Sequence, residues 1–237
     1  MTKDILVLAG TAASIGFIHT LTGPDHYLPF IAMAKARKWS LLRTTVITLL
    51  CGIGHVLSSV VLGFVGIFLG TVVLKLESVE AFRGDLAGWF LIAFGLVYSV
   101  WGVRRALRGK PHQHLHLHED SGHHSHNHDH TSEHAHVHDS KRGPSLTPWV
   151  LFTIFVFGPC EPLIPLIMSP AAESSVAGVV VVALVFGVVT IGTMLASVFA
   201  GVYGLSWVSW SRAERWSHAM AGGTIFLCGA SIKFLGL

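Results

Sequence analysis

The run SSVAGVVVVALVFGVVTIGTMLASVFAGVYG, residues 174–204, contains no charged side chain. About 20 apolar residues in a helix cross the hydrocarbon core of a bilayer, where backbone hydrogen bonds must be satisfied within the protein. The run therefore predicts a membrane-spanning helix. The composition of the whole chain agrees, because 51% of its 237 residues are hydrophobic and only 12% are charged, whereas soluble domains carry about 25% charged residues.

Five other apolar segments accompany this run. The six predicted spans are roughly 5–34, 43–74, 86–103, 147–169, 174–204 and 216–236. They predict an all-α fold, a polytopic membrane bundle of about six transmembrane helices in three parts. Residues 1–108 form a first three-helix membrane repeat, residues 109–146 a hydrophilic, disordered loop, and residues 147–237 a second three-helix repeat.

A glycine–proline pair interrupts the first and the fourth segments and relates the two halves. Gly23-Pro24 lies 135 residues before Gly158-Pro159. The same offset pairs Gly52 with Gly187, Gly66 with Gly201, and Gly88 with Gly223. Proline removes a backbone donor and pushes the preceding residue out of helical conformation, so both helices should be broken. Because each half holds three spans, the second copy should be inverted, a plan found in many secondary transporters.

The basic residues predict the orientation. Twelve of the 16 lysines and arginines fall in alternate loops, after the first, third and fifth spans. By the positive-inside rule, both termini should be extracytoplasmic and the loop 109–146 cytoplasmic, in the plasma or inner membrane. The N-terminal segment lacks the pattern of a cleavable signal peptide, and we expect it to be retained.

Ionisable side chains surround the first break. His19, Asp25 and His26 flank Gly23-Pro24 inside an apolar segment, and the seven-residue spacing of the two histidines places them on one helix face. A histidine or aspartate in a membrane can simply pair with a neighbouring helix. Three such groups at one break favour a functional site, since burying ionisable groups in lipid is costly. Imidazole suits nickel, cobalt, copper and zinc, and a carboxylate compensates the charge of a divalent cation.

Further candidates come from other spans. His55 is the only histidine or acidic side chain of the predicted second span, and Glu161 follows the second Gly-Pro pair. We predict a metal pathway of His19, Asp25, His26, His55 and Glu161. Ser59, Cys160 and Thr190 are additional candidates, although Thr190 is better explained by a bond to its own helix backbone. The three cysteines lie far apart without CxxC spacing, which argues against a disulfide framework.

The hydrophilic loop holds twelve of the sixteen histidines, interleaved with acidic residues. They are His112, His114, His116, His118, His123, His124, His126, His128, His130, His134, His136 and His138. The tract has too few apolar residues to form a packed core. Its composition is typical of metal-chelating low complexity, with pH sensing as the alternative. We predict that it gathers metal.

These motifs resemble those of the nickel/cobalt transporter superfamily, in particular its NicO/RcnA-like and UreH-like members. The resemblance rests on His19, Asp25 and His26, on Gly54-His55 with the serines that follow, and on the histidine-rich loop between the halves. It implies transport of Ni²⁺ or Co²⁺, with the first-span ligands needed for metal selection. Five residues separate His19 from Asp25, where the family typically has four, which leaves the preferred metal open.

The expected function is a secondary transporter of a divalent transition metal and not an enzyme. Ni²⁺ or Co²⁺ is the expected transported ion, with Zn²⁺ as an alternative and no prosthetic group. The cytoplasmic tract favours export, although it could equally accept imported metal. The alternatives are a sulfite/TauE-type exporter of small anions, an intramembrane metal-dependent hydrolase, and a metal sensor or docking protein. The expected partners are the lipid bilayer and divalent metal ions, without nucleic acid, and a homo-oligomer is an alternative to a monomer.

Overall fold

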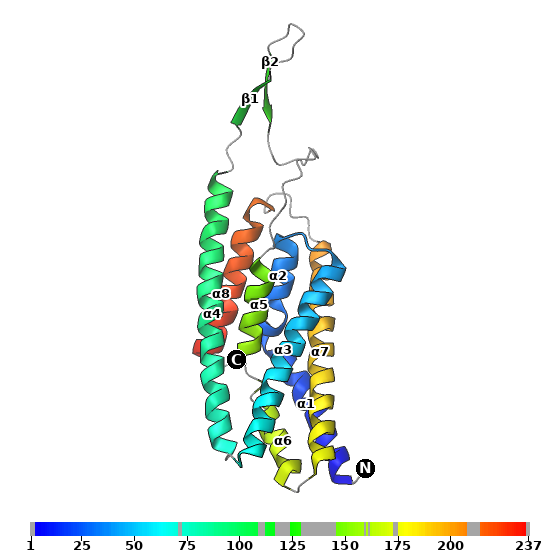
Figure 1. The fold of residues 1–237 in the computed structure, drawn as a ribbon. Coiled ribbons are helices and arrows are strands. Elements are labelled where there is room, and N and C mark those ends of the chain that lie inside the picture. The colour runs from blue at the N-terminus through cyan, green and yellow to red at the C-terminus, as the bar shows by residue number, and fades with distance from the viewer. Residues whose placement is uncertain are drawn as a thin grey trace.

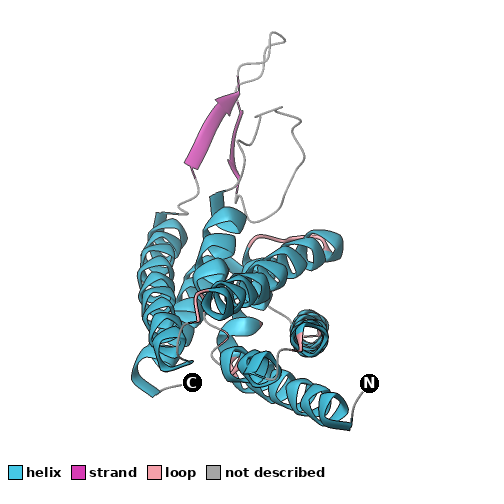
Figure 2. Ribbon diagram, turned by 60° about the horizontal axis from the view of Figure 1, so that its bottom comes forward, coloured by secondary structure: helices cyan, strands magenta, loops and turns pink. Residues whose placement is uncertain are grey.

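The computed structural model describes residues 3–70, 73–108, 112–116, 124–128, 146–158, 160, 162–172, 175–207 and 214–235. The elements in chain order are α1 (Lys3–Thr22), the 3₁₀ turn η1 (Pro24–His26), α2 (Leu28–Ala36), α3 (Leu41–Phe68), α4 (Val73–Arg108), β1 (His112–His116), β2 (His124–His128), α5 (Leu146–Phe157), α6 (Leu163–Ala172), α7 (Val176–Ser206), η2 (Glu214–Trp216) and α8 (Ser217–Leu235). The helices form one elongated bundle, and the two strands stand apart from it (Figures 1 and 2).

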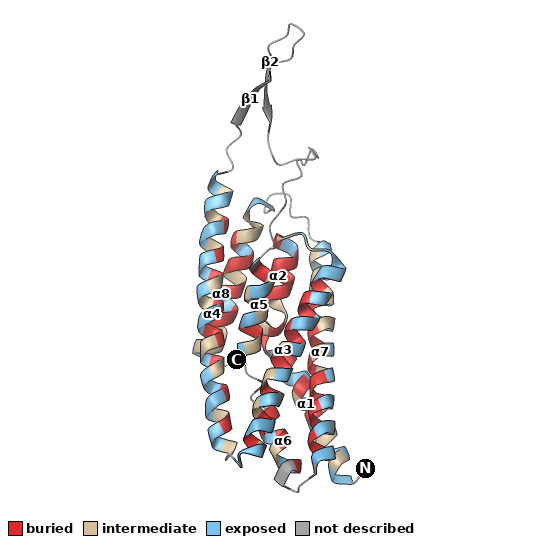
Figure 3. Cartoon of the chain, viewed as in Figure 1, coloured by how far each residue is buried: buried red, intermediate tan, exposed pale blue. Residues whose placement is uncertain are grey.

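Within the described residues, five helices are long and apolar enough to cross a membrane: α1, α3, α4, α7, and α8 together with η2. Their outward faces carry exposed apolar side chains, such as Val97, exposed to 69%, and Val188, exposed to 70% (Figure 3). A water-soluble helix would place polar residues there, whereas lipid is the solvent that such faces fit. The chain is therefore a helical membrane bundle.

Both predicted breaks are present: the segment 5–34 is divided into α1, η1 and α2, and the segment 147–169 into α5 and α6, because the chain leaves helical conformation after Phe157. The third predicted span has different boundaries in the structure. The segment 86–103 was predicted too short, since α4 has 36 residues and begins at Val73. Its early turns include Glu80 and Arg83, which pair with each other inside the bundle. Hydropathy alone placed these charges outside the membrane.

The two halves run in opposite directions along the bundle axis. In Figure 1, α1, α2 and α4 run toward the hairpin end and α3 runs away from it, whereas α5, α6 and α8 run away from that end and α7 runs toward it. The closest packing joins α4 to α8. A Cβ at Gly222 would lie 2.6 Å from Cα of Ser99 and 2.8 Å from the carbonyl oxygen of Gly95, so only glycine allows this approach.

Two apolar clusters form the core, and the histidines lie where they meet. One cluster includes Phe30 and Cys51 and lies toward the hairpin end. The other includes Ala12 and Val56 and lies toward the N-terminal end. His55 stands on α3 between Cys51 and Val56, and the break between α1 and α2 stands between Ala12 and Phe30. The polar groups of the first break are therefore enclosed by apolar layers on both sides.

The described parts of the histidine tract form a two-stranded antiparallel hairpin. His112 lies opposite His128, His114 opposite His126, and His116 opposite His124. The composition of the tract predicted disorder, so this pairing differs from the expectation. Histidine alternates with other residues here, and that spacing has the two-residue period of a strand, which an argument from composition does not consider.

Candidate metal centre

The first break is built by Gly23 and Pro24. The last helical bond of α1 joins the N–H of Gly23 to the carbonyl of His19 at 3.0 Å. Gly23 then adopts an extended conformation, with φ −84° and ψ 97°, as expected for a residue before proline. A single 3₁₀ turn follows before α2 begins. This turn brings His26 back toward His19, so the two rings lie edge to face with centroids 4.8 Å apart.

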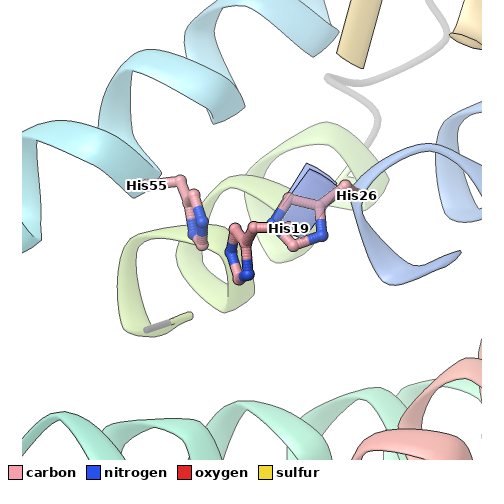
Figure 4. Close-up of side chains that lie close together, drawn as sticks. All are labelled: His19, His26 and His55. Carbon is pink, nitrogen blue, oxygen red and sulfur yellow. The ribbon is translucent and has the colours of Figure 1, made fainter. Parts of the chain in front are cut away.

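A third imidazole reaches the same place from α3. The ring of His55 is 5.1 Å from that of His26, again edge to face. Figure 4 shows the three rings pointing toward one another. One ligand nitrogen from each histidine lies within 4.8 Å of the other two, and His26 and His55 are buried. Three predicted site residues, two from the first predicted span and one from the second, are therefore brought together.

Outer hydrogen bonds prepare two of the rings as ligands. Nδ1 of His26 lies 3.1 Å from the carbonyl of Gly23 and 3.2 Å from Oδ1 of Asp25. Nδ1 of His55 lies 3.3 Å from the carbonyl of Phe155. A carbonyl oxygen only accepts, so each Nδ1 carries the proton and each Nε2 keeps its lone pair. Metal-binding histidines in proteins are oriented in this way.

The Nε2 atoms of these three rings lack partners in the described part of the chain. Those of His19, His26 and His55 are all buried and without a hydrogen-bond partner among the described residues. Leaving such an atom unpaired costs about 1–3 kcal/mol, so three together need an explanation. A divalent ion with bonds of about 2.0–2.1 Å would satisfy all three after modest ring movements. Imidazole is a good ligand for nickel, cobalt and zinc.

Asp25 and Thr190 lie around this cluster. Asp25 is half-buried and its carboxylate contacts the ring of His26, so it supports that ligand from behind. The hydroxyl of Thr190 on α7 is buried and without a partner in the described structure. The sequence predicted that it would bond its own helix, and the structure shows no such bond. A Cβ at Gly16 would lie 3.2 Å from this hydroxyl, so Thr190 faces α1 near His19.

The other predicted site residues are placed differently. Glu161 lies outside the described residues. Ser59 and the backbone of Cys160 are held together by a buried ionic network, and the thiol of Cys160 is packed in the apolar cluster. Of the predicted metal-gathering histidines, His118, His123, His130, His134, His136 and His138 also lie outside the described residues, and the other six lie on the two strands.

Sequence reasoning missed that network. Glu80 is fully buried and forms an ion pair with Arg83. Glu80 Oε2 accepts hydrogen bonds from the hydroxyl of Ser59 at 3.1 Å and from the N–H of Cys160 at 3.2 Å. The three-residue spacing of Glu80 and Arg83, which places them on one helix face, could have indicated the pair. The serines after His55 could have indicated a hydrogen-bond partner for Glu80.

Comparisons with protein-family models, with curated proteins and with solved structures found no match for this chain.

Proposed function

We propose that this protein is a secondary transporter of a divalent transition-metal ion, with Ni²⁺ or Co²⁺ as the preferred cargo and Zn²⁺ as the alternative. One observation carries the proposal: three histidine rings at a break in a membrane helix each offer a ligand nitrogen within 4.8 Å of the other two, and their buried Nε2 atoms have no partner among the described residues. Soft and borderline metals bind such a set of neutral imidazoles, whereas Mg²⁺ and Ca²⁺ prefer oxygen ligands. The carboxylate of Asp25 beside the centre disfavours an anion as cargo.

The position of the centre supports transport. It lies between two apolar clusters and at the junction of α1 and α2. Transporters commonly bind their ions where broken helices meet near the middle of the membrane, because unwound segments supply polar groups there. A centre at this depth gives an ion a place to shed its water and bind halfway across.

An inverted repeat would provide the two halves that move against each other. If α1 to α4 are related to α5 to α8 in order, then each contact should have a counterpart. The packing of α1 on α7 corresponds to that of α5 on α3, and the packing of α2 on α8 corresponds to that of α6 on α4. The two halves also run in opposite directions (Figure 1). This pattern supports rocking of one half against the other as the transport step.

The hairpin end is proposed to be cytoplasmic. Lys35, Arg37 and Lys38 at the end of α2 and Arg104, Arg105 and Arg108 at the end of α4 lie at the same end of the bundle as the hairpin (Figure 1). The register of β1 and β2 pairs six histidine positions across the ladder, 112 with 128, 114 with 126, and 116 with 124. That arrangement supports metal gathering from the cytoplasm and favours export.

The decisive experiment measures metal flux in proteoliposomes with a fluorescent indicator enclosed. Wild type should transport one or more of Ni²⁺, Co²⁺ and Zn²⁺, and His26→Ala should reduce that flux to the background of empty vesicles. His218→Ala is the matched control, because His218 lies in the bundle and bonds Tyr98 instead of joining the cluster. Equal flux through wild type and His26→Ala would disprove the site.

Acidification provides a second test. Metal binding requires imidazole nitrogens free of protons, so flux should fall as the pH is lowered on the side from which metal enters.

Flux also separates a carrier from a metal-dependent hydrolase, because an enzyme would bind the metal without moving it. Binding without flux for every metal in the panel would exclude the transporter.

A further inference from the structure

We propose that Glu80 and Arg83 are positioning residues for the metal centre. Together they hold the break between α5 and α6, and through that break they hold the ring of His55. The proposal rests on the metal centre described above, and it assigns a role to two charged residues that do not touch the metal.

Arg83 bonds the backbone where α5 ends. Its Nη2 donates to the carbonyl of Val156 at 2.7 Å and to that of Gly158 at 3.4 Å. The last carbonyls of a helix have no hydrogen-bond partner within the helix. In the bilayer core there is no water to hydrogen-bond them instead. A cation at a helix C-terminus also interacts favourably with the helix dipole. Arg83 thus stabilises the first side of the break.

Glu80 bonds the backbone on the other side. Its carboxylate accepts from the N–H of Cys160, just before α6 begins at Leu163. The helix dipole favours an anion near the start of a helix, just as it favours a cation near the end. The ion pair of Glu80 and Arg83 therefore clamps the two sides of one break, each charge matching the backbone groups that it contacts.

The same backbone orients His55. The carbonyl of Phe155, one residue before the carbonyl bonded by Arg83, lies 3.3 Å from Nδ1 of His55. A Cβ at Gly158 would lie 3.0 Å from that nitrogen, so the break closely approaches the ring. A displacement of the end of α5 would therefore remove the hydrogen bond that keeps the proton on Nδ1 and the lone pair on Nε2.

Ser58 ties the clamp to α3 directly. Its hydroxyl donates to the carbonyl of His55 at 2.8 Å and accepts from Nη2 of Arg83 at 2.6 Å. Arg83 is thus linked through the Ser58 hydroxyl to the backbone of the turn that carries His55, and it bonds directly to the backbone of the helix that contacts the ring.

Packing alone would not require these charges. Arg83 and Ser58 are the polar residues lining an otherwise apolar groove of about 580 Å³ between α3, α4 and α5. Replacing a buried ion pair with well-packed apolar residues is often neutral or stabilising, and charges inside a membrane usually mark function. The contacts of the pair with the break provide that function.

The test is Co²⁺ titration of the purified full-length protein in detergent, followed by visible absorption, which reports the number and geometry of nitrogen ligands. We expect Arg83→Lys and Glu80→Gln to weaken Co²⁺ binding about 10- to 100-fold, the usual effect of losing an outer partner of a metal ligand. Their spectra should approach that of His55→Ala. Asp85→Asn is the matched control, because it breaks another ion pair of α4, with Lys233 at 2.5 Å, far from the cluster.

The outcomes separate the two proposals. If wild type binds no Co²⁺, Ni²⁺ or Zn²⁺, the metal centre itself is wrong. If wild type binds and both clamp variants keep its affinity and spectrum, the positioning role is wrong and the centre stands. A fall in thermal stability alone, with the wild-type spectrum, also overturns the positioning role. If the clamp variants do not fold, Ser58→Ala decides, since it leaves the ion pair intact: a wild-type spectrum and affinity would overturn the proposal.

Discussion

The α1–η1 break and the α5–α6 break share a glycine–proline sequence, but they are stabilised differently. At the first break the hydrogen bond is local, because the carbonyl of Gly23 lies against Nδ1 of His26 in the same turn. The second is bonded by residues of α3 and α4, namely Ser59, Glu80 and Arg83. In both, a carbonyl near the break contacts Nδ1 of a histidine. One break thus supplies ligands, and the other supports a ligand supplied by α3.

Arg83→Ala should have the largest effect on stability. It would leave the carboxylate of Glu80 buried without its cation, and breaking a buried pair costs about 3–5 kcal/mol. Asp25→Ala at the first break should cost less, because the side chain of Asp25 keeps 21% of its surface exposed, whereas Glu80 is fully buried. Denaturant unfolding in detergent, followed by tryptophan fluorescence, measures both. Equal losses would show that the two breaks depend on charge to the same extent.

The glycines of the two breaks should differ in the same measurement of metal binding. A Cβ at Gly23 would lie 2.6 Å from Nδ1 of His26, whereas one at Gly158 would lie 3.0 Å from Nδ1 of His55. Gly23→Ala should therefore weaken Co²⁺ binding about 100-fold and Gly158→Ala about 10-fold, within the range for disturbed outer partners. Gly192→Ala is the control, since nothing lies within 4 Å of a Cβ there. The reverse order would contradict the assigned roles.

Asp25→Asn should give a smaller change that affects metal binding more than folding. The amide keeps the shape of the carboxylate but loses the charge beside His26, so we expect about a tenfold weaker Co²⁺ affinity. Isothermal titration calorimetry measures the affinity, and thermal unfolding of the apoprotein should remain close to wild type. An unchanged affinity would place Asp25 outside the site.

Asp85→Asn should have the smallest effect. The Asp85–Lys233 pair lies on the periphery of α4 and α8, with the Asp85 side chain exposed to 56%. Exposed ion pairs contribute about 0–1 kcal/mol. The same unfolding assay measures the effect. A loss of stability comparable to that of Arg83→Ala would mean that burial does not distinguish the Glu80–Arg83 pair from the Asp85–Lys233 pair.

Much of the site could be predicted from local sequence. Gly23-Pro24 predicts a break wherever it occurs, because the ring of proline excludes a helix at that point. Polar groups beside it in an apolar segment mark a site, since lipid penalises them. His19 and His26 follow from these rules. His55 was predicted as a third ligand only by its isolation in an apolar span, and its contact with His26 depends on how α3 packs.

The amino-acid sequence alone determined the membrane class, the broken first and fourth segments and the residues at the first break, because hydropathy and proline act over a few neighbouring residues. The meeting of His55 with His19 and His26, the lone pairs left on their Nε2 atoms, and the clamp of Glu80 and Arg83 appeared only in the folded bundle. They depend on contacts between residues as far as 101 positions apart, such as Cys160 with Ser59. No local pattern encodes such contacts, since they arise from the packing of one helix on another.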